Sequence, residues 1–263
     1  MSDQVEDASL REFLEELLRL TDIGLRTVTT DSEPAVAHAW FVRSVDMIRG
    51  ALLLHDNGLG STAHPLVRSA MEHVVGLLWL KEVGWDALPG LSNAHQEWAR
   101  NVKKAIALSN EKGIQPGRRD WSPDLDALIA EIEAQEHAQA DGQWNIAKRF
   151  KIAKQFDLYV AWLSETASSH ATQASATPYL KFRDDRVLLL RTPQEPDTDA
   201  ILNRCAVVAL IGFRAMGEAL NSDYWRASVD RLEAAITDAF QRAGSKRLAD
   251  EPSDDWLGRF DRR

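Results

Sequence analysis

Apolar residues recur at helical spacing along most of the chain, and this pattern predicts a series of helices joined by short turns. The first predicted helix opens at a capping box formed by Ser9 and Glu12. The others cover about 32–57, 62–83, 92–112, a helix that opens near 122, 144–173 with a break near 157, 198–220 and 222–243. Because short turns join antiparallel neighbours, we predict an all-α fold, an antiparallel multi-helix bundle.

One stretch, TPYLKFRDDRVLLLRTP, departs from the helical pattern. Two short runs flank an Asp-Asp pair there, so a short β-hairpin is predicted near 179–191. No internal repeat, low-complexity tract or interdomain linker interrupts the rest. Residues 1–243 are therefore predicted to form one helical-bundle domain. Residues 244–263 are charged, and we expect them to be a partly flexible tail.

Composition narrows the class of protein. Hydrophobic residues make up 44% and charged residues 27% of the 263, which is typical of a soluble protein. The opening MSDQVEDASL is acidic rather than signal-like, and the apolar runs are shorter than a membrane span, so a cytoplasmic protein without membrane contact is expected. The single cysteine, Cys205, lies in an apolar run and excludes an internal disulfide. A net charge of -9 argues against an extensive nucleic-acid surface.

The third predicted helix carries an unusual polar patch. Its stretch 64–80 is apolar on almost every side, which indicates a helix buried all round. The strongly polar residues in its middle are Arg68, Ser69, Glu72 and His73. At about 100° per residue they lie within one arc of about 140°, so they form a single patch. Charges in such a setting have to be paired.

Two interpretations of this patch remain open. Arg68 and Glu72, four residues apart, are compatible with a structural ion pair that fixes the register of the helix. Alternatively the patch is the floor of a site, with Glu72 as acid, base or ligand and Arg68 holding an anion. A second polar stripe, in DLYVAWLSETASSHATQ, either faces the patch or faces solvent; it contains Tyr159, Thr166, Ser169, His170 and Gln173.

These motifs resemble an uncharacterised family of bacterial helical proteins. Its signature is Arg-Ser-x-x-Glu on one helix, here in LVRSAMEHVVGLLWL, and a Tyr/Ser…His segment on a later one. The resemblance covers about residues 36–175. It implies a shared site without naming a reaction, and it maps that site onto Arg68, Ser69, Glu72, Tyr159, Ser164 and His170.

The spacing of Arg68 and His73 also resembles that of HEPN ribonucleases, helical bundles that cleave RNA as dimers without a metal. The resemblance implies His73 as acid or base and Arg68 as the group that binds the phosphate. Ser69 stands where those enzymes have Asn, Asp or His. Arg49 and His55 have a similar spacing, as expected by chance.

Other chemistry has less support in the sequence. A loose metal site could draw on Glu72, His73, His170 and His38, but no His-Glu-x-x-His or Glu-x-x-His motif is present, and we expect no metal and no cofactor. The remaining histidines lie near predicted helix ends or in polar runs. We expect surface positions for His64, His95 and His137.

The sequence thus predicts a soluble helical protein with a buried polar site. We expect a small-ligand-binding or regulatory and interaction module that forms a homo-oligomer, a dimer in the simplest case. The alternative is a metal-independent HEPN-like ribonuclease acting on RNA as a dimer. The candidate catalytic residues are Arg68, Glu72, His73 and His170, and the candidate ligand-binding residues are Ser69, Tyr159 and Ser164. An enclosed patch with Arg68 bonded to Glu72 or to a later helix favours the first function.

Overall fold

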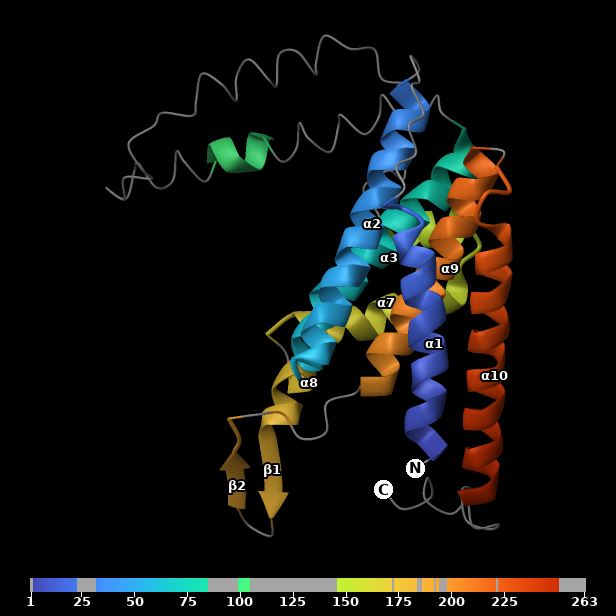
Figure 1. The fold of residues 1–263 in the computed structure, drawn as a ribbon. Helices are drawn as coiled ribbons and strands as arrows, with labels where there is room; N and C mark the ends of the chain where they lie inside the picture. The colour runs from blue at the N-terminus through green and yellow to red at the C-terminus, as the bar shows by residue number, and fades with distance from the viewer. Residues whose placement is uncertain are drawn as a thin grey trace.

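A computed structural model describes most of the predicted bundle (Figure 1). It describes residues 2–22, 32–84, 99–104, 146–171, 173–183, 186–191, 193, 198–220 and 222–250. Long helices run side by side along the molecule: α1 (Ser2–Arg19), α2 (Ser32–Asp56), α3 (Gly60–Val83), α9 (Thr198–Ala219) and α10 (Arg226–Asp250). Together with a short antiparallel hairpin, they confirm the predicted all-α architecture.

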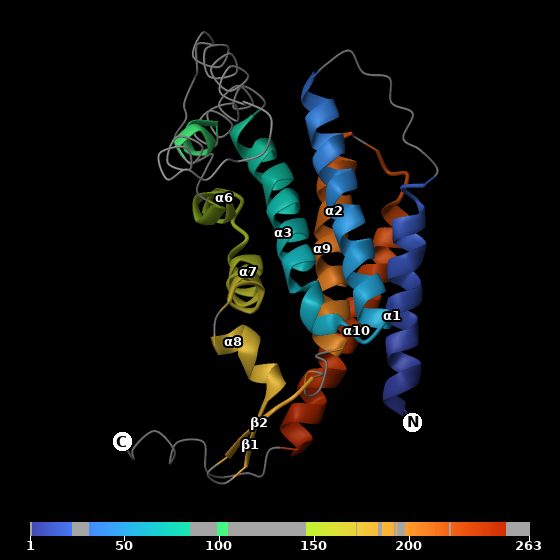
Figure 2. The same cartoon turned by 90° about the vertical axis from the view of Figure 1, so that its left-hand side faces the viewer.

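Shorter helices flank α3 on the side away from α1, as Figure 2 shows. They are α6 (Ile146–Ile152), α7 (Phe156–Ser169), α8 (Gln173–Ala176) and the 3-10 turn η2 (Thr177–Tyr179). Among them α7 makes the closest packing with α3, because its buried side chains, Leu158, Trp162 and Glu165, face the bundle. This places α7 against the helix that carries the polar patch.

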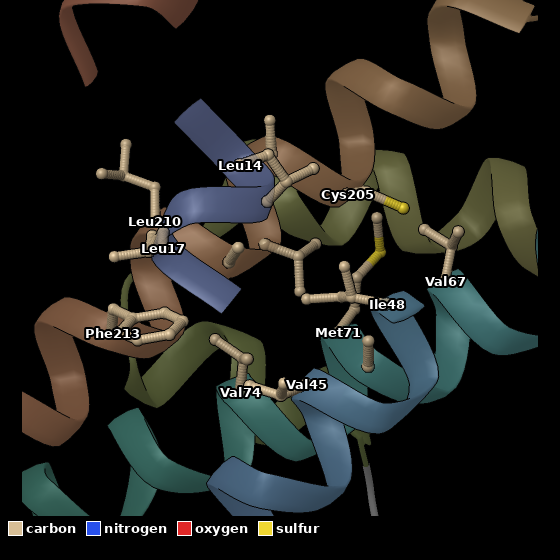
Figure 3. Packing of buried hydrophobic residues seen from close by; sticks show 14 of the residues in the cluster. Leu14, Leu17, Val45, Ile48, Val67, Met71, Val74, Cys205, Leu210 and Phe213 are labelled. Carbon is tan, nitrogen blue, oxygen red and sulfur yellow. The ribbon is translucent and has the colours of Figure 1, made fainter. Parts of the chain in front are cut away.

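The core lies where α1, α2, α3 and α9 meet (Figure 3). Leu14 and Leu17 of α1 are fully buried there, and Met71 of α3 and Phe213 of α9 are as well. The Phe213 ring meets that of Phe41 edge-on, with 4.8 Å between centroids. Such aromatic pairs add about 1 kcal/mol to the area they bury.

Three of the described residues, Gly58, Gly84 and Lys154, have a positive φ. Gly58, with φ of 72°, lies in the turn that follows α2. Lys154, with φ of 55°, lies between α6 and α7, and the backbone N–H of Gln155 donates to the carbonyl of Phe150 (2.9 Å). The break that we predicted near Asp157 is therefore confirmed, at 153–155.

The hairpin pairs β1 (Leu180–Arg183) with β2 (Arg186–Leu189), Leu180 facing Leu189, as the sequence predicted. The hairpin extends from the end of the bundle (Figures 1 and 2). Just before it, the Tyr179 hydroxyl lies 3.2 Å from Ser61 Oγ of α3. This hydrogen bond joins the start of the hairpin to the helical layer.

Several predicted helix ends differ from the structure. Helix α1 begins at Ser2, so Ser9 is inside the helix and does not cap it; nothing between them is a glycine or proline that would stop a helix. Helix α10 begins at Arg226 and continues to Asp250, past the predicted end at 243. The predicted helix that opens near 122 lies outside the described residues, and of 92–112 the structure describes only 99–104, which is helical.

Helix α9 is apolar enough to need a separate comment. The stretch Ala200–Ala219 is long and apolar enough to cross a membrane, and 61% of its most apolar window is buried inside the fold. Core helices of soluble proteins share these properties, so α9 is weak evidence for a membrane span. The cytoplasmic location stays a prediction.

Candidate functional site

The polar face of α3 extends further than the patch predicted from sequence. His64, Arg68 and Glu72 follow one another at intervals of four residues and therefore lie in one stripe along the helix. All three side chains are partly buried, with exposed fractions of 12%, 27% and 35%. Each makes a polar contact with α7 or with the residue that follows it.

The first group of contacts, here called the Arg68 cluster, comprises Arg68, Glu72, Trp162 and His170. Arg68 Nε donates to Glu72 Oε1 (3.0 Å), and the Trp162 indole N–H donates to the same oxygen (2.9 Å). The Arg68 guanidinium lies 5.3 Å from the centre of the Trp162 ring, and its Nη1 lies 2.9 Å from His170 Nε2. The patch thus pairs both with itself and with the opposite helix.

The Arg68 cluster is open to solvent on one side, because His170 follows the end of α7 and is exposed. An arginine N–H can only donate, so the contact with Arg68 requires a neutral His170 with its proton on Nδ1. Tyr159, near the start of α7, stacks on Trp162 at 5.9 Å between ring centroids. The Arg68 guanidinium is thus fixed by Glu72 and His170 and lies against the Trp162 ring.

The second group, here called the Glu165 cluster, comprises His64, Glu165 and Arg204. Glu165 is completely buried in α7. His64 Nδ1 of α3 donates to its Oε2 (2.8 Å), and Arg204 Nη1 of α9 donates to its Oε1 (2.5 Å). Both carboxylate oxygens are thus hydrogen-bonded, which is what a charge needs in order to be buried. One carboxylate connects α3, α7 and α9.

A further arginine lies beyond Glu72 along the same face of α3. The Arg149 guanidinium of α6 lies 5.0 Å from the Trp79 ring centre and 5.9 Å from that of Trp40. Burial lowers the pKa of the Arg149 guanidinium below its usual value, and the nearby carboxylate of Glu72 offsets only part of this shift. Gly76 leaves the space in which the Trp40 ring and Arg149 meet α3.

The structure brings together only part of the predicted site. Arg68, Glu72 and His170 are in direct contact, and Tyr159 lies beside them through Trp162. The His73 ring instead donates from Nδ1 to the Ser69 backbone carbonyl (2.7 Å).

Arg68 and His73 lie at opposite edges of the predicted arc, about 140° apart. No hydrogen bond or ion pair joins these two described residues. Ser164 is exposed on α7, and the Ser69 side chain makes no described polar contact with α7. The site residues therefore separate into one connected group and three residues outside it.

Sequence reasoning missed Trp162, Glu165 and Arg204, and its surface position for His64 is wrong. One available signal was His64 itself, which stands four residues before Arg68 and so extends the same stripe. Another was Glu165, which shares the buried side of its helix with Leu158 and Trp162.

Beside the Glu165 cluster lies a pocket of about 540 Å³ between α7, α9 and α10. Its volume is in the range of small-molecule sites. Apolar side chains from α3, α7, α9 and α10 line much of it, with polar groups from α7, its N-cap and α9 between them. The lining residues are Met71, Gln155, Asp157, Leu158, Ala161, Ala200, Asn203, Arg204, Val207, Val208, Ile211 and Phe240. Arg204 belongs to both the pocket and the Glu165 cluster.

The loose metal set of the sequence analysis does not assemble in the described part of the chain. No three His, Cys, Asp or Glu side chains among the described residues gather closely enough to hold a metal ion. Glu72 instead binds Arg68 and Trp162.

A model of a protein family described as a family of unknown function, DUF5677, matches residues 35–187. That stretch is more than half of the chain. The chain belongs to the DUF5677 family. No curated protein and no solved structure matches it. The prediction of an uncharacterised helical family is confirmed, over nearly the residues expected.

The DUF5677 match contains α3 and α7, and so the whole Arg68 cluster together with His64 and Glu165. Arg204 and the rest of α9 lie after its last matched residue. The family segment therefore supplies one wall of the pocket, and α9 and α10 supply the other.

Proposed function

We propose that this DUF5677 protein is a small-ligand-binding module whose site is the pocket between α7, α9 and α10. The pocket of about 540 Å³ carries this proposal. It is lined by apolar side chains and by a few polar groups that can orient a ligand, the combination found in small-molecule sites. Arg204 is the most defined of these groups, because the buried Glu165 holds its guanidinium at 2.5 Å.

The two polar clusters support this function by holding α7 in place. Trp162 and Glu165 point from α7 toward α3 and bind Glu72 and His64. Ala161 of the same helix lines the pocket. A ligand that contacts α7 therefore acts on the helix that the Arg68 cluster holds. In this proposal Arg68, Glu72 and His170 are positioning residues, and a change at the exposed His170 is a route for regulation.

Binding of Nile red, an uncharged apolar dye, tests the pocket. We expect its fluorescence to rise saturably with the wild-type protein. Ala161 lines the pocket and is half-buried, so Ala161→Trp should fill the site and remove the saturable signal. Ala167 is exposed on the same helix, so Ala167→Trp is the matched control and should bind dye as the wild type does. Equal binding by all three folded proteins would overturn the proposal.

The ribonuclease alternative receives less support from the geometry. Arg68 is engaged by Glu72 and His170, and His73 by a backbone carbonyl, so the two are not poised over one phosphate. Incubation of the purified protein with RNA, beside an Arg68→Ala/His73→Ala variant, tests this alternative. Cleavage by the wild type and not by the variant would restore it.

A further inference from the structure

The proposed pocket differs in charge from one end to the other. Arg204 binds Glu165, so its guanidinium marks the level of Glu165 along α7. Gln155 and Asp157 line the pocket at the start of the same helix, eight residues earlier for Asp157. At 1.5 Å per residue the two ends are about 12 Å apart along α7. The pocket is therefore elongated between two unlike polar groups.

The Arg204 end offers hydrogen-bond donors without a net positive charge. Glu165 is completely buried and neutralises the guanidinium, using one N–H of Nη1. Among the described residues Arg204 has no other hydrogen-bond partner, so its remaining N–H groups can donate to a ligand. A molecule that covers Arg204 must supply an acceptor, because a buried donor without a partner is costly.

The Asp157 end offers a negative charge. The carboxylate of Asp157 is exposed and, within the described part of the chain, has no hydrogen bond or ion pair. Gln155 beside it donates its side-chain N–H to the Ala153 carbonyl, which leaves its amide oxygen as an acceptor. The exposed ring of Phe240, whose face attracts cations, lines the same pocket. Asp157 and Gln155 favour a cation at this end, and the Phe240 ring is a further cation-attracting surface of the pocket.

Resting on the proposed function, we propose that the pocket binds an elongated apolar molecule with an ammonium group at one end and a hydrogen-bond acceptor at the other. The ammonium lies against Asp157, and the acceptor receives N–H groups of Arg204. The apolar body between them packs on Val207, Val208 and Ile211 of α9. A ligand with only the ammonium group or only the acceptor would leave one end of the pocket without a partner.

Three probes with the same eight-carbon chain test this ligand class by displacing Nile red: ω-aminooctanoate, octylamine and octanoate. ω-Aminooctanoate should displace the dye from the wild-type protein at a concentration about five-fold lower than octanoate, the effect of one exposed ion pair. Asp157→Asn should remove this difference. Asp46→Asn, an exposed carboxylate on α2 away from the pocket, is the control and should preserve it.

Asp157 also stands in the first turn of α7, where its charge suits the helix N-terminus. A purely structural role would lower the affinity of Asp157→Asn for all three probes equally, and that result would overturn the ligand class. Octanoate binding as tightly as ω-aminooctanoate to the wild type would overturn it too. Saturable dye binding that is unchanged by Ala161→Trp would instead show that the pocket itself is not the site.

Discussion

Glu165 is the residue on which three helices meet. A buried carboxylate with two partners gives little net stability compared with well-packed apolar side chains, because all three groups lose water. Removing the charge of Glu165 alone is destabilising, because His64 and Arg204 remain without their shared partner. Its value to the fold is therefore specificity: His64, Glu165 and Arg204 satisfy one another in one arrangement of α3, α7 and α9.

Glu165→Gln should lower the free energy of unfolding by about 2 kcal/mol, because the amide keeps the shape but leaves Arg204 without its counter-charge. Arg204 is 26% exposed, so water compensates part of the loss. Urea unfolding measures the change. Glu218→Gln, which breaks the exposed pair with Lys81, should cost less than about 1 kcal/mol. Equal effects of the two changes would contradict the role of Glu165.

Cys205 should be unreactive in the folded protein. Burial, the largest cause, raises the pKa of its thiol to about 12, so the nucleophilic thiolate is scarce at pH 8. A disulfide reagent such as DTNB should label Cys205 only after unfolding in urea. Labelling of the native protein at the rate of a free thiol would contradict the burial.

The same shift gives a pH dependence. Between pH 9 and 12 the unfolded chain loses the Cys205 proton while the folded chain keeps it, so stability falls as pH rises. The slope attributable to this thiol approaches about 1.4 kcal/mol per pH unit. Comparison with Cys205→Ala isolates it from other groups.

At the scale of elements, α2 and α3 approach closely where Gly76 meets Trp40. A Cβ on Gly76 would lie 3.0 Å from the Trp40 ring, a rigid group in contact with Arg149. Gly76→Ala should therefore destabilise the protein by about 1 to 2 kcal/mol, although alanine favours helix. Gly50→Ala meets only the end of the flexible Leu66 side chain and should be neutral or stabilising. Thermal unfolding separates the two, and the reverse order would refute this account.

The packing of α7 on α3 depends on the Arg68 cluster. Arg68→Ala removes the contacts with the partly exposed Glu72, the exposed His170 and the buried Trp162 ring, and should cost about 1 kcal/mol. Hydrogen exchange should quicken in α7 more than in α9. Arg19→Ala, which breaks an exposed pair on α1, is the control and should leave α7 unchanged. Uniform exchange across the bundle would contradict a local role.

What the sequence predicted at this scale depended on local pattern. Periodicity revealed the patch on α3, and the i,i+4 pair of Arg68 and Glu72 followed from it. Contacts between helices that are distant in the sequence leave no such local pattern. Arg204 lies 39 residues after Glu165, and nothing local links them. Trp162 was missed because tryptophan counts as apolar in a hydrophobicity pattern, although its indole N–H donates to Glu72.

At the scale of the molecule, self-association stays a proposal from the sequence. Helix α7 exposes Phe156, Val160 and Leu163, spaced so that they share one face. If copies of the chain pair, light scattering after size exclusion should give twice the 29.5 kDa of one chain. Val160→Glu should then yield a monomer. A wild-type monomer at micromolar concentration would refute the predicted dimer.

The left-handed turn at Lys154 sets the rotation of α7 about its own axis, and so which of its side chains face α3. A helix rotates about 100° for each residue, so deleting one residue from 153–155 would carry Trp162 and Glu165 sideways off α3 together. Both clusters and one pocket wall would then be lost in a single step. Insertions are best tolerated elsewhere, and the length of this three-residue link is as much a part of the site as its charged groups.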